Sequence, residues 1–179
     1  MRESAHRRRL GSRRGSSLVE FTLVGIPLIF ILISIFQMSL GMWSYHTLEE
    51  AVEEGTRFEA VRGANLQAQS ACASNEDSCG ASLNGIAAAL ANAAVGLPAA
   101  NWSATLTAGG STHTCSPLSS CLHVTTTWPP SGDNSSGTTI KISATYNFPS
   151  SLAFFWPGQQ SQVFGTIALK AVSQQTILY

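Results

Sequence analysis

Residues 13–36 read RRGSSLVEFTLVGIPLIFILISIF, and this stretch decides how the rest of the chain is organised. Of the sixteen residues from Phe21 to Phe36, twelve are Leu, Ile, Val or Phe, and the 25 residues from Phe21 to Tyr45 carry no formal charge. A bilayer core about 30 Å thick is crossed by a helix of about 20 such residues. The sequence therefore predicts one membrane-spanning helix near the N-terminus.

Charge is distributed unevenly on either side of this apolar stretch. The 179 residues have a formal net charge of zero, yet six of the ten basic residues fall in the first fourteen positions, whereas residues from Ser16 onward hold four basic and nine acidic side chains. Basic residues mark the cytoplasmic side of a span. We therefore expect a cytoplasmic N-terminus and a C-terminal domain on the far side of the membrane.

A cleaved secretory signal peptide is the alternative for this arrangement. Two features argue against it: the apolar run is longer than a typical signal core, and no A-x-A site follows before Tyr45. Glu20 stands where the apolar core begins. A carboxylate at a bilayer centre costs about 2.5–3.5 kcal/mol on insertion scales, so such a residue often marks function. The alternative for Glu20 is a residue that ends the span among the lipid headgroups.

Residues 13–21, RRGSSLVEF, resemble the class III prepilin signal, in which a basic leader and a glycine precede the cleaved bond and glutamate is the fifth mature residue. The resemblance implies that a membrane-embedded prepilin peptidase cuts between Gly15 and Ser16. It also implies that Glu20 and Phe21 act in subunit assembly. Only glycine offers a peptidase full backbone freedom at the scissile bond.

The resemblance extends beyond the cleavage site. Leu23, Pro27 and the stretch Glu54–Ala60, which reads EGTRFEA, complete a pattern similar to the TadE-like family, covering residues 13–62. This family implies a minor pilin or pseudopilin of a Tad-type (type IVc) pilus, working with other Tad pilins and an inner-membrane assembly platform in surface attachment.

Cleavage would place a new positive charge near Glu20. It removes the leader arginines and creates an ammonium at Ser16, one helical turn from Glu20. Opposite charges attract strongly at low dielectric, within one subunit or between neighbours. We therefore interpret Glu20 as a device that fixes assembly register.

The helical pattern continues past the span. Tyr45, Leu48, Val52 and Thr56 recur at three-to-four spacing. The acidic stretch Glu49–Glu59 is interpreted as a solvated face lying off this stripe. The sequence therefore divides the chain into three segments: a cleaved leader at 1–15, a transmembrane and extended helix at 16–62, and a periplasmic domain at 63–179.

The periplasmic segment predicts an α+β, pilin-like domain, in which the long helix packs on a small antiparallel sheet. Ser82–Val95 is expected to be a helix with Leu83, Ile86, Ala87 and Leu90 buried. Period-two alternation predicts strands at 102–108, 122–128, 138–148 and 162–173, with loops that include 109–112 and 129–137.

Four cysteines, Cys72, Cys79, Cys115 and Cys121, lie in the exported segment, where an even number favours disulfides. Three connectivities are open, and the local pairs Cys72–Cys79 and Cys115–Cys121 are favoured because they need no assumption about the fold. His113 and His123 flank the second pair, which keeps zinc as an alternative, although the chain has no C-x-x-C pair.

The sequence shows no catalytic pattern: G-x-S-x-G, a P-loop and a dinucleotide-binding glycine motif are all missing. The acidic mature body has no basic stripe for nucleic acid. We therefore expect a protein that is not an enzyme and needs no cofactor or metal. It is expected to be held in the inner membrane by a single pass, with a surface pilus as a second location. Two alternatives stay open: a pseudopilin of a type II-like secretion system, and a single-pass anchored periplasmic binding domain.

Overall fold

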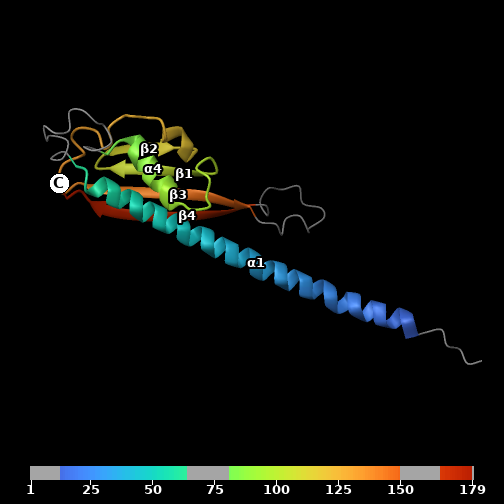
Figure 1. Ribbon diagram of the computed structural model, residues 1–179. Coiled ribbons are helices and arrows are strands. Elements are labelled where there is room, and N and C mark those ends of the chain that lie inside the picture. The colour runs from blue at the N-terminus through green and yellow to red at the C-terminus, as the bar shows by residue number, and fades with distance from the viewer. Residues whose placement is uncertain (1–12, 64–80, 150–165, 179) are drawn as a thin grey trace, which may run out of the picture. The chain divides into compact units, whose positions relative to one another are not determined.

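The computed structural model describes residues 13–63, 81–149 and 166–178, and the chain divides into two compact units between Ser39 and Leu40. The helix α1 spans Arg13–Ala60 and has 48 residues. It is the blue-to-green helix of Figure 1. Its residues up to Ser39 belong to the first unit and those from Leu40 onward to the second.

The large apolar side chains of the first unit are exposed. Leu18 is 67% exposed, Phe21 77% and Phe36 69%. Among the described residues, α1 is the one helix long and apolar enough to cross a membrane. Side chains of this kind are stable in lipid and unfavourable in water. The described residues therefore contain one helix, near the N-terminus, that is suited to anchoring the chain in a membrane.

In the second unit, the four described strands form one sheet in the order β2-β1-β3-β4. They are β1 (Trp102–Ala108), β2 (Ser111–Cys115), β3 (Thr139–Pro149) and β4 (Thr166–Thr176). All neighbouring pairs are antiparallel. Together with α1, this sheet confirms the predicted α+β class.

The central strands show why the alternation predicted them. In β1 and β3, every second residue points to a buried face, where Leu106, Ile140 and Ile142 are at most 1% exposed. The register pairs Leu106 with Ile142, so apolar side chains of neighbouring strands lie side by side. Both strands begin and end within one residue of the sequence prediction.

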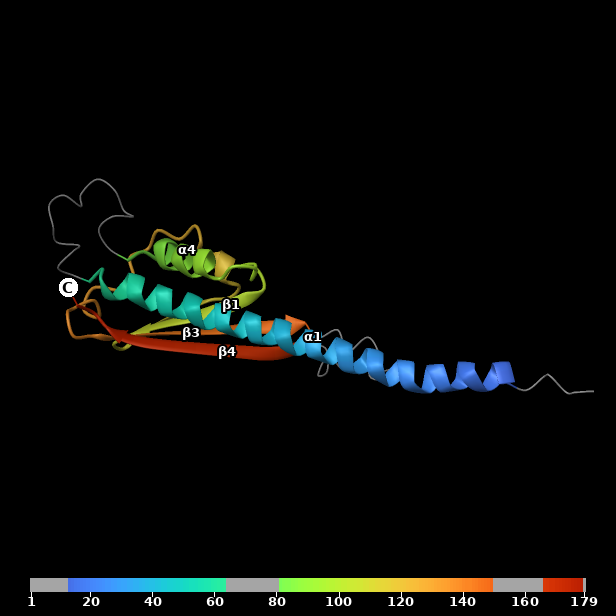
Figure 2. The ribbon, with the colours of Figure 1, turned by 60° about the horizontal axis from the view of Figure 1, so that its bottom comes forward.

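Two helices cover this buried face. Figure 2 shows α4 (Leu83–Ala93) and the C-terminal part of α1 on the same side of the sheet. The Ser82 hydroxyl caps α4 by accepting a hydrogen bond from the Gly85 amide at 3.0 Å. The stripe predicted to be buried is buried, and its members are Leu83, Ile86, Ala87 and Leu90.

Gly55 sets how closely α1 approaches its neighbours. A Cβ atom there would lie 2.6 Å from Leu90 Cδ2 and 3.2 Å from Ile142 Cδ1. Because only a residue without a side chain fits, Gly55 allows α1 to contact both α4 and β3. A hydrogen bond of 2.9 Å between the Thr56 and Ser173 hydroxyls adds a polar link between α1 and β4.

The strand predicted at 122–128 is wrong. This segment follows the short 3₁₀ helix η2 (Leu118–Cys121), and its carbonyl groups accept hydrogen bonds from the first amides of α4. The Thr126 carbonyl accepts a hydrogen bond from the Leu83 amide, and the Val124 carbonyl accepts one from the Asn84 amide, both at 2.9 Å. The first amides of a helix lack partners within it. The segment is therefore used as a cap, despite its alternating pattern.

The prediction of a loop at 109–112 is also wrong in part. Gly109 and Gly110 form the turn of a hairpin, and β2 begins at Ser111. The residues STHT at the start of β2 contain no large apolar side chain, so the pattern gave no strand signal. Pairing with β1 holds this segment extended, and its last residue, Cys115, is buried.

Candidate functional site

The predicted cleavage bond lies at the start of α1. The backbone is helical from Arg13, which places Gly15 and Ser16 in the first turn. The first four amides of a helix have no partner within it, so this turn is the part of α1 that opens most easily. A peptidase at this end of the helix would have few hydrogen bonds to break before reaching the Gly15–Ser16 bond.

The predicted assembly residues lie one turn further along α1. Glu20 and Phe21 are both exposed, and Phe21 is one of the most exposed apolar side chains described, at 77%. Residues four apart lie on the same face of a helix. Cleavage after Gly15 would therefore put the new ammonium of Ser16 on the face that carries Glu20.

Hydroxyl groups within the apolar stretch are satisfied by their own helix. The Ser34 hydroxyl donates to the Phe30 carbonyl at 2.8 Å, and the Ser39 hydroxyl donates to the Ile35 carbonyl at 2.9 Å. A polar group without a partner is costly in hydrocarbon. These internal bonds explain how the span tolerates serine in a bilayer.

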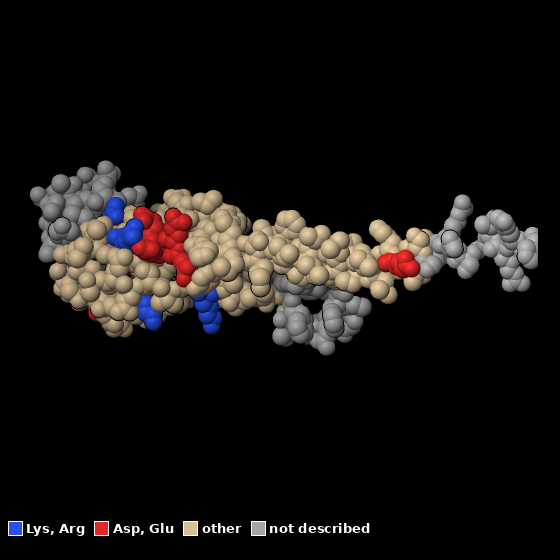
Figure 3. All heavy atoms as spheres, turned by 90° about the horizontal axis from the view of Figure 1, so that it is seen from below, with Lys and Arg blue, Asp and Glu red and all other residues tan. Residues whose placement is uncertain are grey.

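Glu59 is the feature that sequence reasoning missed. The prediction placed Glu49–Glu59 on a solvated face, and Glu49, Glu50, Glu53 and Glu54 are indeed exposed, but Glu59 is only 1% exposed. Figure 3 shows acidic side chains gathered on one face of the second unit. The missed signal was spacing: Glu59 follows Val52 and Thr56 on the same stripe, which is buried.

The carboxyl of Glu59 has no hydrogen-bond partner within the described residues. Desolvation by burial raises the pKa of Glu59 to about 8. The indole N–H of Trp128 acts in the opposite direction and lowers this pKa, although the two groups do not reach normal hydrogen-bond geometry. Glu59 is therefore a neutral acid at pH 7, buried near the C-terminal end of α1.

Cys115 and Cys121 form a disulfide, with their Cα atoms 5.7 Å apart. His113 Nε2 lies 3.7 Å from Cys121 Sγ, so the histidine and both sulfurs are clustered. Cysteine binds zinc as a thiolate, and both cysteines of this cluster are in the disulfide, so only His113 remains as a ligand and the cluster does not fit a metal in this state. His123 is exposed, and the Cys72–Cys79 pairing lies outside the described residues.

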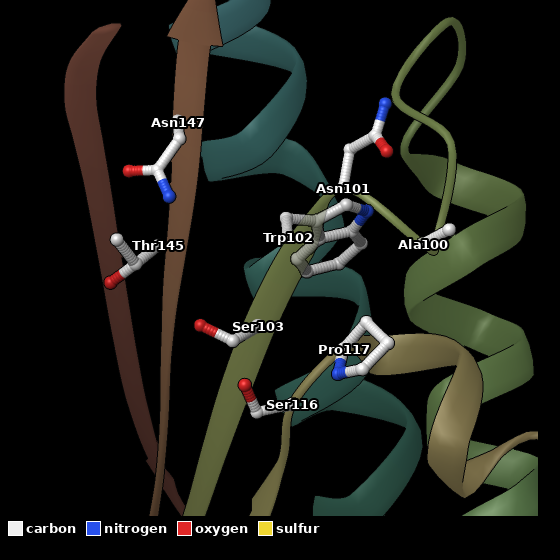
Figure 4. A pocket seen from close by; sticks show the side chains of 8 residues that line it. All are labelled: Ala100, Asn101, Trp102, Ser103, Ser116, Pro117, Thr145 and Asn147. Carbon is white, nitrogen blue, oxygen red and sulfur yellow. The ribbon is translucent and has the colours of Figure 1, made fainter. Parts of the chain in front are cut away.

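A polar hollow lies on the sheet face opposite the helices and extends to the edge near η2. Figure 4 shows its lining residues, and its volume is about 260 Å³. Hydroxyl and amide side chains supply most of its polar groups, and none of its lining residues is acidic, basic or a cysteine. They are Ala100, Asn101, Trp102, Ser103, Ser116, Pro117, Thr145 and Asn147. The hollow can form hydrogen bonds but holds no base to activate a nucleophile.

Comparison with protein families gives a match to the N-terminal part of the chain. Residues 15–57 match the model of a family described as TadE-like protein. The match begins at Gly15 and includes Glu20, the span and Gly55, which confirms the TadE-like resemblance over this segment. Comparison of the chain with curated proteins and with solved structures gives no match.

Proposed function

We propose that this chain, a TadE-like protein over residues 15–57, is a minor pilin or pseudopilin of a Tad-type pilus. The observation that carries the proposal is the position of the match, which starts at the cleavage glycine and continues through the exposed apolar helix. Association with the Tad pilus follows from the family, whereas the role of a processed subunit is our inference.

In the proposed sequence of steps, the protein is first inserted in the inner membrane. The leader arginines keep the N-terminus in the cytoplasm, and the second unit faces the periplasm. Prepilin peptidase then cuts the Gly15–Ser16 bond. The disulfide between Cys115 and Cys121 supports this topology, since disulfides persist in the oxidising periplasm and are rare in the cytoplasm.

Assembly is the proposed next step, and the protein performs it without catalysis. The ammonium of Ser16 and the carboxylate of Glu20 fix the depth and register of α1 among other Tad pilins or at the assembly platform. Attraction between such charges is strong where lipid lowers the dielectric constant. The exposed Phe21 adjoins this charged pair and would contact the neighbouring helix.

Two variants test processing and assembly separately. Gly15→Leu should leave an uncut precursor that is still inserted in the membrane, because the span is unchanged. Glu20→Gln should be inserted and cut, yet should fail to join partner subunits, so that mature protein accumulates and cells carry fewer pili. Glu54→Gln is the matched control, since Glu54 is an exposed glutamate of α1 in the second unit.

The measurements are the mass of the mature N-terminus, membrane fractionation and a count of pili. An intact Met1 in cells with active prepilin peptidase would reject processing, and with it the pilin proposal. Normal piliation in Glu20→Gln cells would reject the register role and leave processing standing. If Glu20→Gln cells process the protein correctly and keep their pili but fail to secrete other proteins, the chain would instead be a pseudopilin of a secretion system.

A further inference from the structure

An apolar surface surrounds α1 at the start of the second unit. Five large apolar side chains there are each at least half exposed. They are Leu40 (51%), Met42 (55%), Trp43 (51%), Val95 (66%) and Ile167 (55%), and we call them the apolar collar. Exposed apolar side chains that gather in one region are typical of a site that contacts a membrane or another protein.

Close packing brings the collar together from three elements. Gly96, next to Val95, lies against Trp43: a Cβ atom on Gly96 would be 2.5 Å from Trp43 Cη2. Gly96 also has a φ of +83°, which favours glycine. The loop after α4 is therefore held directly on the indole of Trp43.

The sheet reaches the same turn of α1 from another direction. A Cβ atom on Gly41 would be 3.9 Å from Phe148 Cε1, so the end of β3 adjoins this turn. Phe148 pairs with Ile167 of β4. The exposed side chains of Val95 and Ile167 thus lie around the turn Gly41–Trp43, although they are far apart in the sequence.

The collar lies where the apolar stretch of α1 ends. Along the helix, the next acidic residue after the collar is Glu49, and along β4 the nearest charged residue to Ile167 is Lys170. From Leu18 to Leu40 the helix rises about 33 Å, which is close to the thickness of a bilayer core. Tryptophan is enriched at the boundary between lipid and water, which is the position this length gives to Trp43.

We propose that the apolar collar rests in the headgroup region of the bilayer, so that the second unit is docked on the lipid surface. The proposal rests on the membrane anchoring of α1 proposed above. The occupant is lipid because the collar adjoins the end of the spanning stretch. Its side chains are apolar and carry no formal charge, and apolar faces of this kind are buried at the boundary between headgroups and acyl chains.

Photocrosslinking in the full-length protein tests this docking. The photoreactive residue p-benzoylphenylalanine replaces Val95 or Ile167, and the protein is reconstituted in vesicles of phosphatidylethanolamine and phosphatidylglycerol. Val61 and Val172 are matched controls, because they are 42% and 59% exposed and lie just after α1 and in β4, outside the collar. After irradiation, intact mass measures the lipid adducts.

We expect about tenfold more lipid adduct at positions 95 and 167 than at 61 and 172, because an interfacial surface penetrates only the first several ångströms of the bilayer. Equal yields at all four positions would overturn the docking. An adduct to a second polypeptide at 95 or 167, instead of to lipid, would also overturn it and assign the collar to a protein interface.

A fifth position separates this inference from the anchoring on which it rests. The same residue at Phe30, within the spanning stretch, should form lipid adducts if α1 crosses the bilayer. Adducts at Phe30 without adducts at 95 and 167 would reject the collar and keep the anchor. Loss of lipid adducts at Phe30 would reject both. Circular dichroism of each variant checks that the fold is retained.

Discussion

The two halves of α1 have similar apolar residues and opposite surroundings. In the first unit Leu28 is 55% exposed, whereas in the second unit Leu48 is fully buried. The helix is continuous between them. Burial is therefore set by what surrounds each half and not by residue type. The first half is suited to lipid and the second half forms part of a protein core, so matched substitutions should have unequal effects.

The largest effect is expected from the buried acid of the second half. Burial raises the pKa of Glu59 from 4.5 to about 8. Between these two pH values the unfolded chain is ionised while the folded chain keeps its proton, so stability falls as pH rises through this window. The loss should approach about 5 kcal/mol by pH 8.

Urea unfolding of the full-length protein in detergent, measured from pH 4.5 to pH 8.5, checks this linkage. Glu59→Gln should remove most of the decline, because an amide does not ionise. Glu54→Gln should keep it, since Glu54 is exposed. The same slope in wild type and in Glu59→Gln would show that other groups cause the pH dependence.

A leucine pair compares the two halves directly. Leu48→Ala should lower the free energy of unfolding of the second unit by about 3 kcal/mol, because it leaves a cavity in a packed core. Leu28→Ala should leave that free energy unchanged, since the Leu28 side chain is exposed to the surroundings of the first half. Chemical unfolding in detergent measures both. Equal losses would mean that the two halves unfold as one body.

The pattern of success and failure in the sequence predictions follows from the same physics. The strands β1 and β3 and the helix α4 were predicted closely, because each has one apolar face and its period shows in the sequence. Residues 122–128 alternate too, but their carbonyls cap α4, and only the fold reveals that use. Glu59 was missed because a charged residue was assumed to be exposed, against the spacing that placed it on the buried stripe.

The functional residues also divide into those that a local sequence pattern indicates and those that only the fold brings together. Gly15, Ser16, Glu20 and Phe21 lie within seven residues, so a local motif was enough to predict a cleavage and assembly site there. The apolar collar joins α1, the loop after α4 and β4, and no local pattern links these elements. The collar could be recognised only from the structure, where Gly96 packs against Trp43.

A glycine pair makes the comparison sharper. Gly55→Ala should destabilise the second unit by about 2 kcal/mol, because the added Cβ meets the Leu90 side chain at 2.6 Å. Gly25→Ala should be neutral, since its Cβ would meet only Phe21 Cε1, at 4.0 Å. Thermal unfolding in detergent provides the measurement. A stability loss for Gly25→Ala equal to that of Gly55→Ala would indicate that the first half is also closely packed.

The smallest effect concerns hydroxyl groups. Thr56 and Ser34 both donate to carbonyls of their own helix, but Thr56 also meets the Ser173 hydroxyl at 2.9 Å. Thr56→Val keeps the shape of the side chain and removes this link, so it should cost about 1 kcal/mol. Ser34→Ala removes only an internal bond and should leave the second unit unaffected.

A double-mutant cycle with Ser173→Ala isolates the link between α1 and β4. If the hydroxyl pair acts as described, Thr56→Val should cost nearly nothing once Ser173 is alanine, because the shared bond is already lost. Additive losses would show that Thr56 stabilises the fold through its own helix alone. In that case the hydroxyl groups in both halves of α1 would contribute only through bonds within the helix. The two halves would then differ only in the surroundings of their apolar side chains and in Glu59.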